Sequence, residues 1–272
     1  TFTMNGGTIE SNNATKLGGA IYLDGGDAFV NGGEIKTNTA VDGGGTYLSG
    51  GTLTVTGGSI IENVASTNGG GAYLAGGTLT INGGSIYANT ADNGAGAYLA
   101  GGTLTASGGS ISSNSASING GGAYLAGGEL IVSGGDIKSN EATDGAGAYL
   151  NAGALKMSDG NISSNIASEN GGGAYLAGGT LTITGGSISS NTASNGGGAY
   201  LAGGTLDISG GDISSNTASN GGGAYVNNGT INMSNGNIAS NKAGNGGGAY
   251  VSDGALNISG GTISSNNATN GA

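Results

Sequence analysis

The chain has 272 residues, of which 66 are glycine, and it contains no proline, cysteine, histidine or tryptophan. Its formal net charge is −11, from 16 acidic residues against five lysines. Nucleic-acid binding requires clustered basic residues that displace phosphate counterions, so this composition excludes it. The lack of cysteine excludes a disulfide framework, and no apolar run is long enough for membrane insertion of this segment.

A motif of isoleucine, two residues, asparagine, one residue and alanine recurs about every 25 residues along the whole chain. A second, glycine-rich motif that ends in Tyr-Leu or Tyr-Val lies between its copies. A fixed period of this length is typical of a solenoid. Because the apolar positions keep their phase without a break, we interpret residues 1–272 as one β-helical domain rather than a disordered chain. The isoleucines are Ile9, Ile35, Ile60, Ile86, Ile111, Ile137, Ile162, Ile188, Ile213, Ile238 and Ile263.

Residues 71–91 show the pattern of one coil in chain order. Three segments with alternating polar and apolar residues, at 71–75, 78–81 and 85–91, are typical of strands, and the glycine pairs between them indicate turns. Hexapeptide-built left-handed coils would have about 18 residues. The sequence therefore predicts an all-β, right-handed parallel β-helix with three short strands per coil of 25–26 residues. About ten to eleven coils at ~4.8 Å each give a length of roughly 50 Å.

The alternation also predicts which side chains form the core. In the coil at 71–91, Leu74, Leu79, Ile81, Ile86 and Ala91 point inward, with Ala72 as a small filler. Successive copies of a strand position stay apolar, as expected if neighbouring coils bury each other's faces. The column that contains Ile81 reads Val30, Val55, Ile81, Ala106, Val132, Met157, Ile183, Ile208, Met233 and Ile258.

The asparagine of the first motif predicts a structural ladder at one corner. Asparagine tolerates left-handed backbone angles, and its amide both donates and accepts hydrogen bonds along the axis. The spacing from tyrosine to the next isoleucine is always 13 residues, whereas from isoleucine to tyrosine it is 12 or 13, so the corner after the alanine absorbs the variation. The ladder residues are Asn12, Asn38, Asn63, Asn89, Asn114, Asn140, Asn165, Asn191, Asn216, Asn241 and Asn266.

The tyrosines should form a second column, on the outer surface. Each tyrosine lies in the sequence between two residues that should point inward, so its own side chain should point outward. Ten rings are therefore expected in one column along one face of the solenoid. One interpretation is structural, because aromatic pairs on adjacent strands stabilise a sheet. The other is a contact stripe for glycans or for a neighbouring filament. Its candidate binding residues are Tyr73, Tyr98, Tyr124, Tyr149, Tyr175 and Tyr200.

Two other functions are weaker alternatives. A regular Thr-x-Thr face is typical of ice-binding β-helices, but the pairs are interrupted, for example at Glu129 and Lys156. A polysaccharide-degrading β-helix would need a cluster of acids with basic partners, and here histidine and arginine are missing. Asp207 and Asp212 lie in one coil as the nearest approach to a carboxylate pair. We therefore predict no catalytic residues, no cofactor and no metal site.

The segment Ile9–Leu23, with Asn-x-Ala followed by Gly-Gly-Ala-Ile-Tyr-Leu, resembles the repeats of chlamydial polymorphic membrane proteins and related bacterial adhesin-like β-helices. The resemblance extends over the whole chain, although that family usually has phenylalanine where this chain has isoleucine. It implies an adhesin that is secreted or exposed at the cell surface.

Together these patterns predict a non-enzymatic structural or adhesive module, a stalk or fibre, located outside the cell. Its expected partners are further copies of itself, joined end to end or laterally, or host or neighbouring cell-surface molecules and glycans. Thr1 begins on a strand and Ala272 ends within a turn, so we expect an uncapped fragment of a longer repeat array. Uncapped coils present unpaired backbone groups, which favours end-to-end association.

Overall fold

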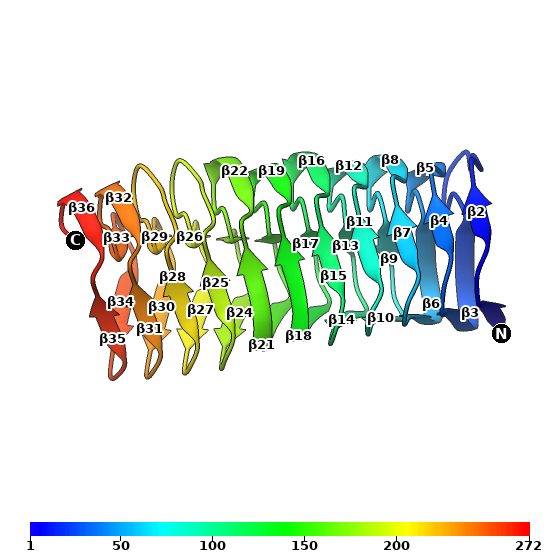
Figure 1. The fold of residues 1–272 in the computed structure, drawn as a ribbon. Helices are drawn as coiled ribbons and strands as arrows, with labels where there is room; N and C mark the ends of the chain where they lie inside the picture. The colour runs from blue at the N-terminus through cyan, green and yellow to red at the C-terminus, as the bar shows by residue number, and fades with distance from the viewer.

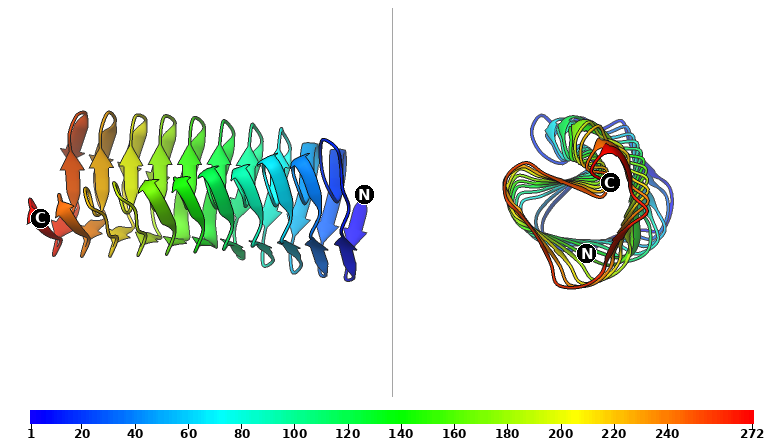
Figure 2. Two further views of the ribbon diagram at one scale, coloured as in Figure 1. Left: turned by 90° about the horizontal axis from the view of Figure 1, so that it is seen from above. Right: turned by 90° about the vertical axis from the view of Figure 1, so that its left-hand side faces the viewer.

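The computed structural model describes residues 1–272 as a stack of about 11 coils, each of about 25 residues. Every secondary-structure element is a β-strand, and no helix is long and apolar enough to cross a membrane. The coils follow one another in chain order from N-terminus to C-terminus along a single axis (Figure 1). Seen along this axis, the chain winds as a right-handed spiral (Figure 2). The right-handed parallel β-helix predicted from the sequence is confirmed.

Each coil presents strands on three successive sides, here called the tyrosine, threonine and isoleucine sides. The tyrosine side holds β9 (Ala72–Leu74), β13 (Ala97–Leu99), β17 (Ala123–Leu125), β20 (Ala148–Leu150), β23 (Ala174–Leu176), β26 (Ala199–Leu201), β29 (Ala224–Val226) and β33 (Ala249–Val251). The threonine side holds β1 (Phe2–Met4), β10 (Thr78–Ile81), β14 (Thr103–Ala106), β24 (Thr180–Ile183), β27 (Thr205–Ile208), β30 (Thr230–Met233) and β34 (Ala255–Ile258). The isoleucine side holds β2 (Thr8–Glu10), β4 (Glu34–Lys36), β7 (Ser59–Ile61), β11 (Ser85–Tyr87), β15 (Ser110–Ser112), β25 (Ser187–Ser189), β28 (Asp212–Ser214), β31 (Asn237–Ala239) and β35 (Thr262–Ser264).

Four longer strands bend around a corner and join two sides. β3 (Ile21–Val30) and β6 (Thr46–Val55) connect the tyrosine and threonine sides, and β18 (Glu129–Lys138) and β21 (Ala154–Ser163) connect the threonine and isoleucine sides. As a result, 28 strands form one continuous hydrogen-bonded sheet. All pairing is parallel, and on the three sides residues lie opposite their equivalents in the next coil, as Tyr98 does to Tyr124.

A fourth short strand, at the corner that follows the ladder asparagine, adds to the three predicted segments. These corner strands are β5 (Thr39–Asp42), β8 (Val64–Asn68), β12 (Thr90–Asn93), β16 (Ser115–Asn119), β19 (Glu141–Asp144), β22 (Ile166–Asn170), β32 (Lys242–Asn245) and β36 (Asn267–Asn270). Up to β22 the register of neighbouring corner strands shifts by one residue at each step. For example, Ala91 lies opposite Ala116, whereas Asn93, two residues later, lies opposite Asn119, three residues later. The shift arises because every second coil has one extra residue in its corner strand, which forms a β-bulge. The bulges contain Thr67, Ile118 and Glu169 in their respective coils.

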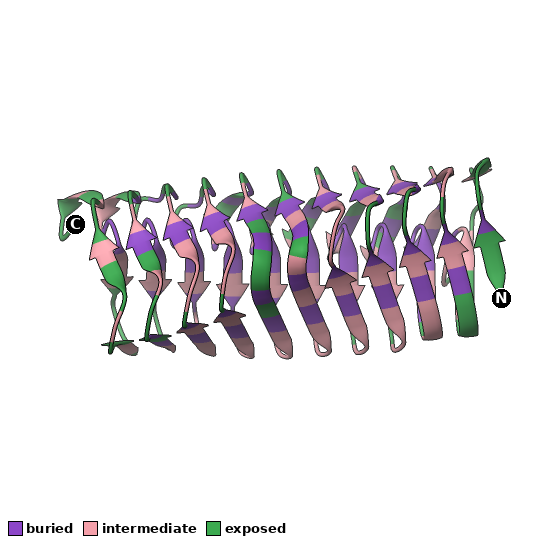
Figure 3. Cartoon of the chain, turned by 60° about the horizontal axis from the view of Figure 1, so that its bottom comes forward, coloured by how far each residue is buried: buried purple, intermediate pink, exposed green.

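The core is one continuous column of aliphatic side chains. Leu74, Leu79, Ile81 and Ile86 have no exposed surface, which confirms the inward positions predicted by alternation. Buried and exposed bands alternate along the strands accordingly (Figure 3). Ala91 lies in a separate small cluster of alanines under the corner strands, not in the main core.

The left-handed backbone position lies one residue earlier than the predicted asparagine. In every coil the residue before the ladder asparagine has a positive φ, from 51° at Thr37 to 59° at Ser190, and no asparagine does. An L residue in this region is strained, so the surrounding contacts must hold it there. The expectation that asparagine is used for its left-handed tolerance was wrong, and its hydrogen bonds explain its presence instead.

Close approach between coils explains the third glycine of the Gly-Gly-Gly segment. A Cβ atom at Gly122 would lie 2.5 Å from the carbonyl oxygen of Gly147 and 2.7 Å from Cγ2 of Ile137. A heavier residue would separate the coils at this point, so the glycine is required for stacking.

Candidate functional site

The ten predicted tyrosine rings form a single uninterrupted stack, here called the tyrosine stack. Neighbouring ring centroids are 4.7 to 5.4 Å apart, and the planes differ by 3° to 29°. The in-register parallel pairing produces this geometry, because each ring projects from the same position of successive strands. The stack consists of Tyr22, Tyr47, Tyr73, Tyr98, Tyr124, Tyr149, Tyr175, Tyr200, Tyr225 and Tyr250.

The rings lie on the surface and are half-buried by one another. Tyr22, at the first coil, is 51% exposed, and the others are less exposed. No tyrosine hydroxyl is buried without a hydrogen-bond partner, so the hydroxyl groups reach solvent. Because each ring face covers the next, an external ligand meets ring edges and hydroxyl groups instead of open faces. This geometry does not provide the flat aromatic platform on which a sugar ring would stack.

Partial burial keeps the phenols protonated well above neutral pH. Burial, reinforced by Tyr98 and Asp42, raises the pKa of Tyr73 to about 12. Burial, reinforced by Tyr149 and Asp144, likewise raises the pKa of Tyr175 to about 12. The physical cause is the removal of water from the charged phenolate. The pKa values of further rings are raised by burial too: Tyr47, Tyr98, Tyr124, Tyr149 and Tyr200.

The asparagines of the first motif form a saturated inner ladder. In each step the Nδ2 group and the main-chain N–H of one asparagine both donate to Oδ1 of the next, as between Asn89 and Asn114 at 3.0 Å. The second Nδ2 hydrogen goes to an isoleucine carbonyl of the preceding coil, as from Asn89 to Ile60. From Asn38 to Asn241 these side chains are fully buried. In this buried stretch no polar side-chain group of the inner ladder remains for a ligand.

A second, outer ladder lies at the corner strands and was missed from the sequence. Asn220 donates to Asn195, and Asn195 donates to Asn170, each at 2.9 Å. Donation here runs toward the N-terminus, opposite to the inner ladder. From Asp42 onward, an Asn or Asp directly before the glycines of each coil is the signal that could have revealed it. The outer ladder consists of two hydrogen-bonded runs, each beginning at an aspartate: Asp42, Asn68, Asn93 and Asn119, then Asp144, Asn170, Asn195, Asn220, Asn245 and Asn270.

The acidic residues are dispersed, and no three of them form a group that could hold a metal ion. Asp207 and Asp212 bind different neighbours: Asp207 accepts from Asn232 at 2.8 Å, and Asp212 accepts from Asn237 at 2.7 Å. Three of the five lysines, Lys36, Lys138 and Lys156, form ion pairs with nearby carboxylates.

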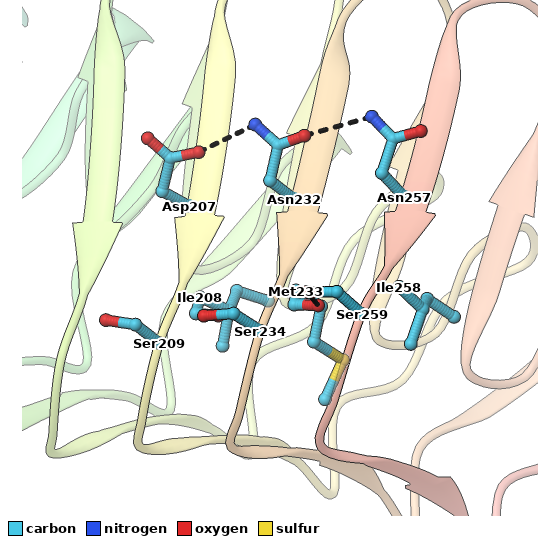
Figure 4. Close-up of a pocket in the computed structure, with 9 residues that line it drawn as sticks. All are labelled: Asp207, Ile208, Ser209, Asn232, Met233, Ser234, Asn257, Ile258 and Ser259. Carbon is cyan, nitrogen blue, oxygen red and sulfur yellow. Dashed lines mark hydrogen bonds between the residues drawn. The ribbon is translucent and has the colours of Figure 1, made fainter.

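A shallow hollow of about 370 Å³ crosses β27, β30 and β34 (Figure 4). One row of its lining is Asp207, Asn232 and Asn257, in which Asn257 donates to Asn232 at 3.0 Å. A row of serines lies below it: Ser209, Ser234 and Ser259. With one carboxylate and no basic side chain in its lining, the hollow lacks the paired acid and base of a hydrolytic site.

The threonine face is regular over only a short length. Thr52, Thr78 and Thr103 lie in register, and Thr54, Thr80 and Thr105 form a parallel column beside them. Glu129 and Ile131 interrupt both columns in the next coil, and Lys156 follows.

The fold and these columns define the molecule as a parallel β-solenoid repeat protein. No protein family, curated protein or solved structure matches the chain. The resemblance to chlamydial polymorphic membrane proteins therefore stays a hypothesis.

Proposed function

We propose that this chain is a non-enzymatic structural or adhesive module, a stalk or fibre segment of a secreted or cell-surface protein, and that the tyrosine stack is its contact surface. The observation that carries the proposal is the stack itself, nine consecutive ring pairs within 5.4 Å along one side. Aromatic side chains that leave edges and hydroxyl groups at the surface are enriched where proteins make contacts.

Two further features support a scaffold in preference to an enzyme. The polar side chains hydrogen-bond in rows along the axis, as in both asparagine ladders, and do not converge on one point. Uninterrupted parallel pairing along the whole length suits a rod that displays a repeated surface.

Ice binding has less support than contact through the stack. The longest run of Thr-x-Thr pairs covers three consecutive coils, from Thr52 to Thr105, before Glu129 breaks the array. The tyrosine stack is continuous over ten coils by comparison.

The test uses the whole chain and two matched triple variants. Tyr98→Ser, Tyr124→Ser and Tyr149→Ser remove the centre of the stack, and Thr80→Ser, Thr105→Ser and Thr182→Ser alter another outer side. We expect the tyrosine variant to lose retention on intact cells at least tenfold, with its β-type circular dichroism preserved. Equal retention by both variants would overturn the proposal. Turnover of a polyuronate or measurable thermal hysteresis would replace it with the enzyme or ice-binding alternative.

A further inference from the structure

The tyrosine stack borders a lane of surface without charge. From Tyr47 to Gly229, no tyrosine of the stack and none of the four residues that follow it is charged. Charged residues occur in this segment only in the first and last copies, at Asp24 and Asp253. In a chain of net charge −11, another acidic molecule meets little repulsion over this uncharged lane, and the carboxylates that act on the stack are Asp42 and Asp144.

The fold requires the glycines of this lane but not its alanines. Gly102 has a φ of 71°, and a Cβ atom there would lie 2.5 Å from the carbonyl oxygen of Gly77, so the turn demands glycine at the fourth residue after each tyrosine. The outward residue two positions after each tyrosine has no such restriction, because Ser49, Asn151 and Asn227 occupy equivalent positions. In five of the six coils from Tyr73 to Tyr200 this position is nevertheless alanine: Ala75, Ala100, Ala126, Ala177 and Ala202.

The spacing of the stack restricts what can lie against it. Hydroxyl groups and ring edges recur once per coil, at 4.7 to 5.4 Å, while the ring faces are covered by one another. A partner that engages the whole stack must repeat at the same axial distance, which is the strand spacing of a parallel sheet. Another β-solenoid whose coils are stacked at the same spacing stays aligned, coil by coil, with the tyrosine stack along the full contact.

We propose that the partner of the tyrosine stack is a second copy of this chain, aligned antiparallel, with the two stacks lying against each other and the alanine turns of one chain against those of the other. This inference rests on the proposed function of the stack as a contact surface. Such a pairing is isologous, so one patch serves both chains. A two-fold axis between the coils of Tyr124 and Tyr149 places Ala126 opposite Asn151, and further out it sets Ala100 opposite Ala177, Ala75 opposite Ala202 and Ser49 opposite Asn227.

The available area suits a reversible pair. If each coil contributes on the order of 80 Å² from its ring edge and turn, ten coils supply roughly 800 Å² per partner, the size of an ordinary specific interface. The contact area grows with the number of paired coils, so the affinity depends on the length of the array.

The test adds three negative charges to the lane or to another side of the same chain. Ala75→Glu, Ala126→Glu and Ala177→Glu place carboxylates in the lane at alternate coils. Ser112→Glu, Ser163→Glu and Ser214→Glu change the net charge equally on the isoleucine side, whose column already holds Glu10, Lys36 and Lys138. Sedimentation equilibrium measures the association of both variants and of the unaltered chain at low and high salt.

We expect the unaltered chain to dimerise, the lane variant to associate at least tenfold more weakly, and the serine variant to keep its association. Dimerisation should strengthen with salt, because screening weakens the repulsion between two acidic chains. A chain that stays monomeric, or equal behaviour of both variants, would overturn the inference. Retention on cells or glycans that depends on the tyrosines but occurs without dimers would overturn it while leaving the proposed function intact.

Discussion

Asn114 is joined twice to Asn140 across one coil step: its Nδ2 group and its main-chain N–H both donate to the same Oδ1 atom at 3.0 Å. Asn140 in turn donates to Asn165 at 3.0 Å and to the carbonyl of Ile111 at 3.1 Å. Because these groups are buried, the ladder connects neighbouring coils through bonds that water cannot replace.

Replacing Asn140 with alanine should destabilise the protein by roughly 3 kcal/mol or more, since it leaves buried donors and acceptors on both neighbouring coils without partners. The urea midpoint measures the effect. Asn195→Ala, in the half-buried outer ladder, is the matched control and should cost about 1 kcal/mol. Equal losses for the two variants would contradict the structural role given to the inner ladder.

Ala88 has φ of 54°, and glycine adopts this conformation without the strain of a Cβ atom. Ala88→Gly should therefore stabilise the fold by about 0.5 kcal/mol, after the greater freedom of glycine in the unfolded chain is subtracted. Ala88→Val should destabilise it, because a β-branched side chain tolerates this region poorly. Thermal unfolding of the three proteins gives the order, and a valine variant as stable as the glycine variant would refute the argument.

Two glycines with different surroundings test how tightly the coils stack. A Cβ atom at Gly122 would clash with the carbonyl oxygen of Gly147 at 2.5 Å, whereas at Gly108 the nearest atoms are at 3.5 Å, an ordinary contact. We expect Gly122→Ala to cost several kcal/mol, on the order of a severe packing defect, and Gly108→Ala to be nearly neutral. Urea unfolding followed by circular dichroism checks both, and a mild effect at Gly122 would show that the coils separate easily.

The tyrosine stack should make the protein unstable in strong alkali. The folded state raises the pKa of Tyr73 and Tyr175 from 10.0 to about 12, so it holds these protons more tightly than the unfolded chain. The resulting stabilisation is complete below pH 10 and is lost as the pH rises through 12. Unfolding midpoints measured across this range should fall, and Tyr73→Phe with Tyr175→Phe should reduce the decline. An unchanged pH profile in that double variant would contradict the assignment.

Much of the architecture follows from the sequence because a parallel solenoid repeats one local pattern. Alternation assigned Leu74, Leu79, Ile81 and Ile86 to the core and placed the tyrosines on the outer surface, since successive strand residues point to opposite faces. The recurrence of Ile, Asn and Tyr at one spacing fixed the coil length, because residues in register must occupy equivalent positions.

Only the tertiary structure decided how residues about 25 positions apart contact one another. Side-chain direction across a coil step depends on the backbone angles at the corners, which put Ser113 and its equivalents in the left-handed region and turn the ladder asparagines inward. The same packing closed the tyrosine faces against each other and aligned Asn195 with Asn220 in the outer ladder. The sequence repeat determines which residues are neighbours along the solenoid axis, because equivalent residues stack in successive coils. The orientation of their side chains depends on the backbone conformation and packing of the whole coil, which only the tertiary structure shows.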